Sequence, residues 1–483
     1  MRPDPSVWTP WASAVRVGLA RADISPPLGL PTRNWAASTT LGNTGRHRPL
    51  TATAVAMSDG AGRDALLISL DLGWWRRAED EARLRRRVLD ATGLAEDAVL
   101  VHLVHTHAGP YTMAEDPAEP SRPVADYLDA LAESVAGIAV AALERAEPAT
   151  ITWSSGHCGL AVNRDLPRER REVVAFNPRR PADDTLLVGR VTGAADEVLA
   201  VLVNYACHPT TLAWENSLVS PDWVGSAREV VEEATGARCV VLQGASGDLS
   251  PRDQATADPA TADRNGRVVG YAALGVLENM PAPGRELVFK GVVESGAPLG
   301  IWEPEPARPD ATLRTGRRTV GMRVAESARP RESADGVEVP AQVVAERRLR
   351  HSTLAADYVA DGVARHPLWV WRVGAAVVVA HPGEAFSDLQ LALRQRHPGL
   401  PIVVMNCTNG PGFVYLPPAA DYAKDKYQVW QTLVGPGGLE LLIEAADRAI
   451  GELVDEPTEE RADERADERA EVPADEDPHV TSA

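Results

Sequence analysis

Two histidines separated by one residue follow an apolar run in the stretch LVHLVHTHAGPYT, residues 100–112. Imidazole is costly to bury without a partner, and it is the commonest neutral metal ligand in proteins. If the run is a strand, His105 and His107 project from one face and can share a site, whereas His102 projects from the opposite face. The pattern therefore predicts a metal site at the end of this strand, provided that other strands supply further ligands.

Other apolar runs also end in residues that are able to do chemistry. These residues are Asp71, His208, Asp248 with Ser250, His381 with Glu384, and a Gly-rich loop before Tyr415. In α/β sheets ligands bind beyond the carboxyl ends of the strands, so these side chains are candidates for one pocket. A catalytic zinc takes three protein ligands and keeps one position open for water. His105, His208 and Glu384 would supply such a set from three separate strands.

Each of these residues also has a purely structural interpretation. A histidine before proline, as at His208 or His381, is often a turn residue, and Ser250 could cap a loop. The GASG stretch at 244–247 lacks the G-x-S-x-G pattern of a hydrolase nucleophile. GASGD and the GPGG stretch near 435 fit neither a phosphate-binding loop nor a dinucleotide fingerprint. On spacing alone, metal binding and structural roles both stay open.

Composition narrows the class of protein. The chain has 483 residues and is 44% hydrophobic, enough for one large domain or two ordinary ones. A net charge of −19 disfavours binding to nucleic acid and to anionic membranes. The four cysteines form no C-x-x-C pair, so neither a zinc finger nor a disulfide framework is indicated. There is no apolar run long enough to cross a bilayer and no signal-peptide pattern, so we expect a cytoplasmic protein without stable membrane insertion.

Strand-like runs alternate with helical patterns along most of the chain. This alternation predicts α/β layers around a mostly buried sheet, although it does not give the order of the strands. The fold that we expect is α/β, with two packed layers of β-sheet flanked by helices. We predict one catalytic domain over residues 1–454 and a disordered acidic tail over 455–483. Within the domain, the Arg/Pro-rich segment at about 303–345 is expected to be irregular, with one possible strand at 319–326, and the run 369–381 is expected to be a strand.

Several stretches, taken in order, resemble the neutral (non-lysosomal) ceramidase family. They are VGLARADISPPLGLP, HTHAGP, VNRDLP with FNP, ACHPTTL, GASGDLSPRD, PGEAF and VYLPPAADYAKDKY, and they span roughly residues 16–440. The resemblance implies the family's N-terminal catalytic fold. It also implies zinc-dependent hydrolysis of the N-acyl carboxamide bond of ceramide or a ceramide-like compound, through water activated by Zn²⁺.

The resemblance also implies the metal ligands. They would be His105, His208, Glu384 and Tyr415. The family's tyrosine motif has further tyrosines seven and twelve residues after the first, and Tyr422 and Tyr427 stand at those positions. This fit selects Tyr415 rather than Tyr422 as the ligand.

Further roles follow from the same resemblance. His107 and Tyr427 would stabilise the oxyanion and pass a proton to the leaving amine. Ser250 would line the site as a hydrogen-bonding group rather than attack the substrate. Arg164 and its neighbour Asn163 would bind the polar head of the substrate. Acids at matching positions would orient ligands or fix loops, and these are Asp71, Asp222 and Asp248.

The chain also departs from the family pattern. Leu416, Pro417 and Pro418 replace the threonines that follow the first tyrosine of the family motif. We expect no C-terminal immunoglobulin-like domain. The substrate is therefore expected to be an N-acylated lipid or a small amide.

A metal-dependent esterase or phosphoesterase is an alternative function, but a second metal cluster and a phosphate clamp are not apparent in the sequence. A second alternative is a non-catalytic binding protein that retains the fold, but the presence of every predicted metal ligand argues against it.

Overall fold

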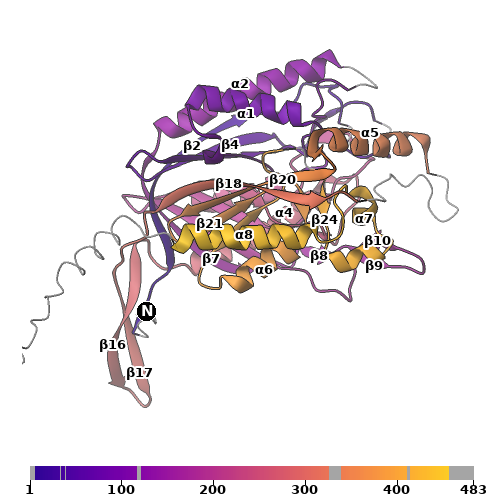
Figure 1. The fold of residues 1–483 in the computed structure, drawn as a ribbon. Coiled ribbons are helices and arrows are strands. Elements are labelled where there is room, and N and C mark those ends of the chain that lie inside the picture. The colour runs from indigo at the N-terminus through magenta and orange to yellow at the C-terminus, as the bar shows by residue number, and fades with distance from the viewer. Residues whose placement is uncertain are drawn as a thin grey trace, which may run out of the picture.

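The computed structural model describes residues 6–32, 34–38, 40–116, 121–325, 339–410 and 414–455. Two β-sheets lie face to face and helices cover their outer faces (Figure 1). The predicted α/β fold with layered sheets and flanking helices is therefore confirmed. The predicted acidic tail lies, from residue 456 onward, outside the described residues.

The larger sheet has eight strands in the order β14-β12-β11-β7-β2-β4-β5-β6. Their bounds are β2 (Trp11–Asp23), β4 (Thr51–Ser58), β5 (Asp64–Leu70), β6 (Val99–Leu103), β7 (Glu147–His157), β11 (Thr185–Gly193), β12 (Val198–Tyr205) and β14 (Arg238–Gln243). The strands of the pairs β5–β6 and β12–β14 run parallel, and the other neighbours run antiparallel. Helices α1 (Ala78–Thr92) and α3 (Trp223–Thr235) lie between the strands of these parallel pairs in the chain.

The smaller sheet has five strands. They are β18 (Leu313–Arg323), β20 (Val363–Val373), β21 (Ala376–Ala380), β23 (Ile402–Met405) and the short β19 (Val359–Ala360), which pairs with β20. Strands β21 and β23 run parallel, with α6 (Asp388–Arg396) between them in the chain. In each of the three parallel pairs (β5–β6, β12–β14 and β21–β23), the carboxyl ends of the two strands therefore point in the same direction.

Two sequence predictions for this sheet were wrong. The run 369–381 is not one strand, because Gly374 adopts a left-handed φ of 56° and turns the chain between β20 and β21. The segment at about 303–345 is not irregular throughout, since it contains all of β18 and the first residues of α5 (Ala341–Tyr358). The possible strand predicted at 319–326 covers only the second part of β18, because Arg317 and Arg318 are solvent-exposed on this edge strand, while Leu313 and Met322 are buried.

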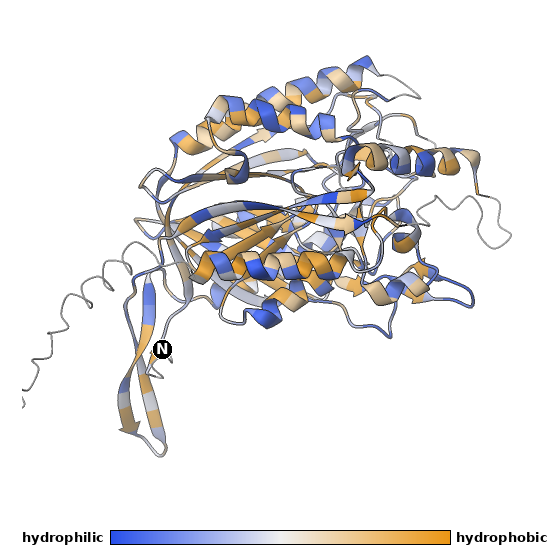
Figure 2. Cartoon of the chain, viewed as in Figure 1, coloured by the Kyte–Doolittle hydropathy of each residue, from blue (hydrophilic) through white to orange (hydrophobic). Residues whose placement is uncertain are grey.

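The core lies in layers between these elements. Large side chains such as Trp369 and Trp371 fill the space between the sheets. Helices α1 and α2 (Arg122–Glu144) cover one half of the outer face of the larger sheet, and α3 and α4 (Pro259–Glu278) cover the other half. Helices α6 and α8 (Gly438–Asp455) pack on the smaller sheet. Figure 2 shows the apolar colour along the central strands and both polar and apolar positions on the outer helices.

The larger sheet curls until its two edge strands meet. Gln243 N on β14 donates a hydrogen bond to His102 Nε2 on β6 at 2.9 Å. On the neighbouring strand β5, Ser69 Oγ donates to Val241 O of β14 at 3.1 Å. The other nitrogen of His102 lies 3.1 Å from Asn406 O, directly after β23. His102 therefore links the two edge strands of the larger sheet to the residue that follows β23 of the smaller sheet.

Shorter elements complete the described fold. They are β1 (Val7–Trp8), β3 (Gly45–Arg46), β8 (Ala161–Asn163), β9 (Asp165–Pro167), β10 (Glu172–Val174), β13 (Leu218–Val219), β15 (Leu249–Pro251), β16 (Arg285–Glu294), β17 (Pro298–Pro306), β22 (Glu384–Ala385), β24 (Tyr415–Leu416), α7 (Tyr427–Gln431) and the 3₁₀ helices η1 (Glu96–Ala98) and η2 (Ala419–Ala423). Among the helices described, none has the length and apolar character that crossing a bilayer requires.

Candidate metal centre

The three parallel strand pairs deliver their carboxyl-terminal loops to one place. His105 follows β6, His208 follows β12, and Glu384 follows β21 at the start of β22. His105 and Glu384 are 2% exposed and His208 is fully buried. The prediction that these strand ends converge matches the geometry, because Glu384 Oε2 lies 3.3 Å from His105 Nε2 and 3.0 Å from His208 Nε2.

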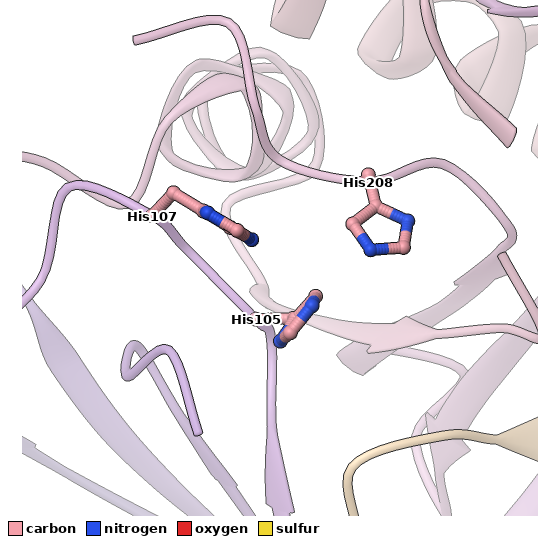
Figure 3. Close-up of side chains that lie close together, drawn as sticks. All are labelled: His105, His107 and His208. Atoms are coloured by element: carbon pink, nitrogen blue, oxygen red, sulfur yellow. The ribbon is translucent and has the colours of Figure 1, made fainter. Parts of the chain in front are cut away.

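A third imidazole belongs to the same group. Figure 3 shows His105, His107 and His208 grouped around one point. Each ring offers a nitrogen that lies within 4.8 Å of those of the other two, so the three residues could hold a metal ion. The reason that we gave for the pairing of His105 with His107 was wrong, since β6 ends at Leu103 and strand alternation does not reach them. A left-handed φ of 72° at His105 turns the chain there instead.

The second nitrogen of each buried ligand candidate fixes its tautomer. His105 Nδ1 lies 2.9 Å from Gly73 O, and His208 Nδ1 lies 2.7 Å from Ser246 O. A carbonyl oxygen can only accept, so each Nδ1 carries a hydrogen, and in the neutral ring Nε2 keeps its lone pair. Metal-binding histidines are commonly held in this way. Two nitrogen lone pairs and a carboxylate oxygen therefore face one another in a buried space, an arrangement that suits a bound cation.

The electrostatics of Glu384 and His208 match this donor set. Although burial opposes ionisation, the facing imidazoles of His105 and His208 hold the pKa of the Glu384 carboxyl well below its usual range. Burial and the nearby Arg164 guanidinium lower the pKa of His208 to about 3, so its ring is neutral near pH 7. A neutral imidazole and a carboxylate are the forms that bind metals. For His105, although burial opposes protonation, the neighbouring Cys407 and Glu384 raise the pKa well above its usual value, so a metal ion bound there would have to displace a proton.

Tyr415 lies beside Glu384. The two residues are register partners in the parallel pairing of β22 with β24. Arg164 Nη2 donates to the Tyr415 hydroxyl at 3.2 Å, and the Tyr427 ring lies 5.5 Å from the Tyr415 ring, centroid to centroid. Tyr422, in contrast, donates its hydroxyl to Val434 O at 2.8 Å. The structure thus brings Tyr415 to the site and engages Tyr422 elsewhere.

His107 differs from the other two histidines in its contacts. Both of its ring nitrogens are buried and lack a hydrogen-bond partner among the described residues. Its ring packs between Trp35 and Trp74, with centroid distances of 4.9 Å and 4.8 Å. Burial, followed by the neighbouring His105 and His208, lowers its pKa well below the usual value. His107 is therefore a neutral imidazole with two unused polar atoms next to the ligand candidates.

Arg164 and Asn163, the predicted substrate-binding residues, have protein partners. Arg164 is 3% exposed and also bonds Gly247 O through Nη2 at 2.8 Å. Asn163 is buried and its Nδ2 lies 3.4 Å from Asp248 Oδ2. Ser250 is buried on β15, and its hydroxyl has one contact among the described residues, 3.5 Å to Pro251 O. The hydroxyl of Ser250 is thus not joined to the ligand candidates.

The three acids named from the sequence hold loops. Asp71 forms two bonds of 2.6 Å with Arg228, away from the histidines. Asp222 caps α3 and accepts from Leu212 N at 2.8 Å, which fixes the loop after His208. Asp248 accepts from Ser387 N at 2.8 Å and so fixes the segment after Glu384. Burial raises the pKa of Asp222 and that of Asp248 to about 6.

The sequence reasoning missed Cys407 and the tryptophans. Cys407 follows β23, has a left-handed φ of 51°, and its Sγ lies 3.5 Å from His105 Nδ1. The strand-end rule that selected the other residues applies to it equally, since the run PIVVMNC ends there. No local signal marks Trp35 and Trp74 as walls of the site, because they come from loops whose partners are distant in the chain.

Comparison of the sequence with family models and with curated proteins gives no match. Comparison of the fold with solved structures does. A neutral ceramidase from Pseudomonas aeruginosa matches with a TM-score of 0.67 and 17% identity, over 92% of this chain and 76% of that chain. A ceramidase complexed with C2 matches with a TM-score of 0.68, the same identity and the same coverage. The chain therefore has a neutral ceramidase-like fold.

Proposed function

We propose that the protein is a zinc-dependent amide hydrolase that cleaves the N-acyl carboxamide bond of ceramide or a ceramide-like compound. One observation carries the proposal: in a buried space, Glu384 Oε2 lies within 3.3 Å of the Nε2 atoms of both His105 and His208. Imidazole nitrogens and a carboxylate grouped in this way suit a bound divalent cation.

His105, His208, Glu384 and Tyr415 would hold the metal, and His107 stands beside them as a further imidazole. Two nitrogens and two oxygens suit Zn²⁺, which accepts mixed donor sets of this kind. A zinc ion bound there would supply Lewis-acid chemistry, polarising the amide carbonyl and lowering the pKa of water.

The remaining chemistry belongs to side chains of this chain. In the reaction water adds to the carbonyl carbon, the C–N bond breaks, and the products are a carboxylate and an amine. We assign His107 to the oxygen anion that develops on the carbonyl and to proton transfer, because both of its nitrogens are without a partner. Tyr427, which packs against Tyr415, is assigned to the proton that the leaving nitrogen must gain.

Arg164 is assigned a double role. Its bond to the Tyr415 hydroxyl orients that residue, and its remaining N–H groups are the donors for the polar head of the substrate. Asn163, held against Asp248, fixes the end of strand β8 directly before Arg164. Ser250 is assigned a supporting role on β15, which pairs with that strand.

The substrate class is an N-acylated lipid amide, with a small amide as the alternative. The fold resemblance to ceramidases supports the lipid amide. Metal analysis of the purified protein, together with the variants His105→Ala and Glu384→Ala, tests the centre. The wild type is expected to contain about one zinc per chain and each variant to lose it. Stoichiometric zinc in both variants would refute the ligand assignment.

A panel of substrates tests the reaction. We expect turnover of N-acyl lipid amides to exceed that of matched esters, phosphoesters and short amides. Preferred turnover of a phosphoester would replace the amide hydrolase with a metal-dependent phosphoesterase. Binding without turnover of any of them would favour a non-catalytic protein.

A further inference from the structure

Lys426 is a buried lysine that stands directly before Tyr427 in the chain. It is 1% exposed, and its ammonium nitrogen Nζ lies 2.6 Å from Asp165 Oδ2, 2.7 Å from Asp421 Oδ2 and 3.0 Å from Glu172 Oε2. We call these four residues the Lys426 cluster. Lysine is almost never buried so fully unless it is paired, and the proposed reaction uses none of these four side chains.

The Lys426 cluster is an ionised group of side chains. Although burial opposes the charge, Asp165 and Asp421 raise the pKa of the Lys426 ammonium above its usual value. Lys424 and Arg180 also approach these carboxylates, but 42% and 33% of their side chains are exposed. Among the described residues, Lys426 is the cation that contacts all three carboxylates of the cluster. Removal of its ammonium would leave three buried acids without their common partner.

The cluster joins the segment that carries Arg164 to the segment that carries Tyr427. Asp165 follows Arg164 at the start of β9, and Lys426 precedes Tyr427 at the start of α7. Figure 1 shows β9, β10 and α7 together at one end of the molecule. On the other side of Tyr427, Gln428 Nε2 donates to Asp165 Oδ1 at 2.9 Å. Both neighbours of Tyr427 therefore bond the one carboxylate that lies beside Arg164.

The same ammonium contacts the segment that follows Glu384. Lys426 Nζ lies 5.1 Å from the centre of the Phe386 ring, and Phe386 is two residues after Glu384. A cation at this distance from an aromatic face is attracted to it. Phe386 N donates in turn to Leu416 O at 3.2 Å, directly after Tyr415. Lys426 therefore lies where the segments that carry several candidate site residues meet.

We propose that Lys426 is a positioning residue of the candidate site. Its ammonium holds the segments of Arg164 and Tyr427 at a fixed separation, so it sets the distance between the donor for the polar head and the group assigned to the leaving nitrogen. The effect of this separation on turnover rests on the proposed function, whereas the link between the two segments does not. Misplacement by about 1 Å can cost about 100-fold in rate, so a cluster that contacts no substrate can still control turnover.

Hydrogen exchange tests the link without any substrate. Lys426→Met removes the ammonium, and Asp165→Asn keeps it but removes the carboxylate beside Arg164. In both variants the backbone amides of residues 164–174 and 415–431 are expected to exchange at least about tenfold faster than in the wild type. Unchanged exchange in both segments would overturn the proposal, and Asp165→Asn decides the matter if Lys426→Met does not fold.

Arg372→Met is the control for loss of a cation from an ion pair. Arg372 Nη2 lies 2.7 Å from Asp310 Oδ2, and both side chains are partly buried. Arg372 pairs with the amino-terminal half of β21, whereas Glu384 follows the carboxyl end of that strand. The exchange of residues 164–174 and 415–431 should therefore stay as in the wild type.

A double-mutant cycle on a water-soluble N-acyl amide tests the effect on turnover. Lys426→Met and Asp165→Asn should each lower kcat at least about tenfold while the zinc content stays unchanged. In the Tyr427→Phe background the same two substitutions should change kcat by less than about twofold, because the hydroxyl that the cluster positions is already absent. Arg372→Met should change kcat by less than about twofold in either background.

Two outcomes separate this role from the proposed function. Losses from Lys426→Met and Asp165→Asn that are equally large with and without the Tyr427 hydroxyl would show that the cluster supports only the fold, and they would overturn the positioning role. Absence of amide hydrolysis in the wild type would count against the proposed function. The exchange measurements would then still decide whether Lys426 links the two segments.

Discussion

Glu384 and Tyr415 are register partners across the two-residue parallel pairing of β22 with β24. Glu384 N donates to Val414 O at 2.8 Å, so the backbone fixes the spacing of the two side chains. One oxygen of Glu384 faces two imidazoles, and the Tyr415 hydroxyl is held by Arg164. A short β-bridge therefore sets the positions of two candidate ligands that lie far apart in sequence.

Replacement of Tyr415 by Phe is expected to weaken zinc binding by about 10- to 100-fold and to lower amide hydrolysis at least as much, because an oxygen ligand is lost. Tyr422→Phe is the matched control, since its hydroxyl bonds only Val434 O in the described structure. This control should cost about 1 kcal/mol of unfolding free energy without changing zinc affinity. Competition titrations with a chelator measure both variants, and equal zinc affinities would remove Tyr415 from the ligand set.

Gly247→Ala is expected to displace Glu384, because Gly247 packs closely against the backbone of that residue. A Cβ at Gly247 would lie 2.7 Å from Glu384 O and 2.8 Å from Phe386 Cδ1. We expect a loss of about 1–3 kcal/mol in stability together with weaker zinc binding. Gly137→Ala is the control, since nothing lies within 4 Å of its Cβ position in helix α2. There the same substitution should stabilise the protein by up to about 1 kcal/mol in urea unfolding. Unchanged zinc affinity in Gly247→Ala would show that the loop yields without moving Glu384.

His102 predicts a specific dependence of stability on pH. Its Nε2 accepts from Gln243 N, and burial lowers its pKa from 6.5 to about 3. The unfolded chain therefore binds a proton between these two values that the folded chain does not. Stabilisation by this group is complete above about pH 6.5 and is lost as the pH falls toward 3. Between about pH 7 and about pH 4 the loss from His102 amounts to about 3 kcal/mol.

The variant His102→Gln should flatten this pH dependence and cost about 1–3 kcal/mol at neutral pH. Urea unfolding as a function of pH measures both effects. His157→Gln changes a histidine whose side chain is 79% exposed and whose pKa is raised by its bond to Asp184. The stability that this pair contributes is lost as the pH rises, so the variant should not flatten the loss of stability between about pH 6.5 and 4. A profile of His102→Gln that runs parallel to the wild type would show that the His102 imidazole is not kept neutral by the fold.

Asp71→Asn tests whether this acid supports the fold or the metal. Asp71 and Arg228 are both buried and share two bonds of 2.6 Å. Removal of one partner of a buried pair typically costs about 3–5 kcal/mol, and we expect that loss with zinc affinity unchanged. The control Asp23→Asn breaks a half-exposed pair with Arg46 and should cost less than about 1 kcal/mol. Loss of zinc from folded Asp71→Asn would instead place Asp71 in the metal centre.

Much of the candidate site was predictable from local patterns. Apolar runs that end in His, Glu or Tyr are visible in the sequence, and the rule that ligands gather beyond strand ends selected His105, His208 and Glu384 without knowledge of strand order. The choice of Tyr415 required the family resemblance, because phenolate is an uncommon zinc ligand and its strand is only two residues long.

Other features depend on contacts that local patterns do not encode. The position of His107 follows from the left-handed turn at His105 rather than from strand alternation. The apolar pattern of β18 is interrupted by arginines, which are exposed at the edge of the sheet. β20 and β21 form one continuous apolar run in the sequence, because a single glycine, Gly374, makes the turn between them. The meeting of β6 with β14 joins residues more than a hundred positions apart, and no short pattern predicts it.

The contact between β6 and β14 also affects how readily the protein could aggregate through its sheet edges. An open strand edge offers unpaired backbone groups to which another polypeptide can add. Here Asn409 bonds Val101 and Val99 of β6 through its backbone and side chain, and Arg21, Glu232 and Ser69 bond backbone groups of β14. Along both strands a foreign chain would have to displace existing bonds before it could attach, so neither is an easy template for fibril growth.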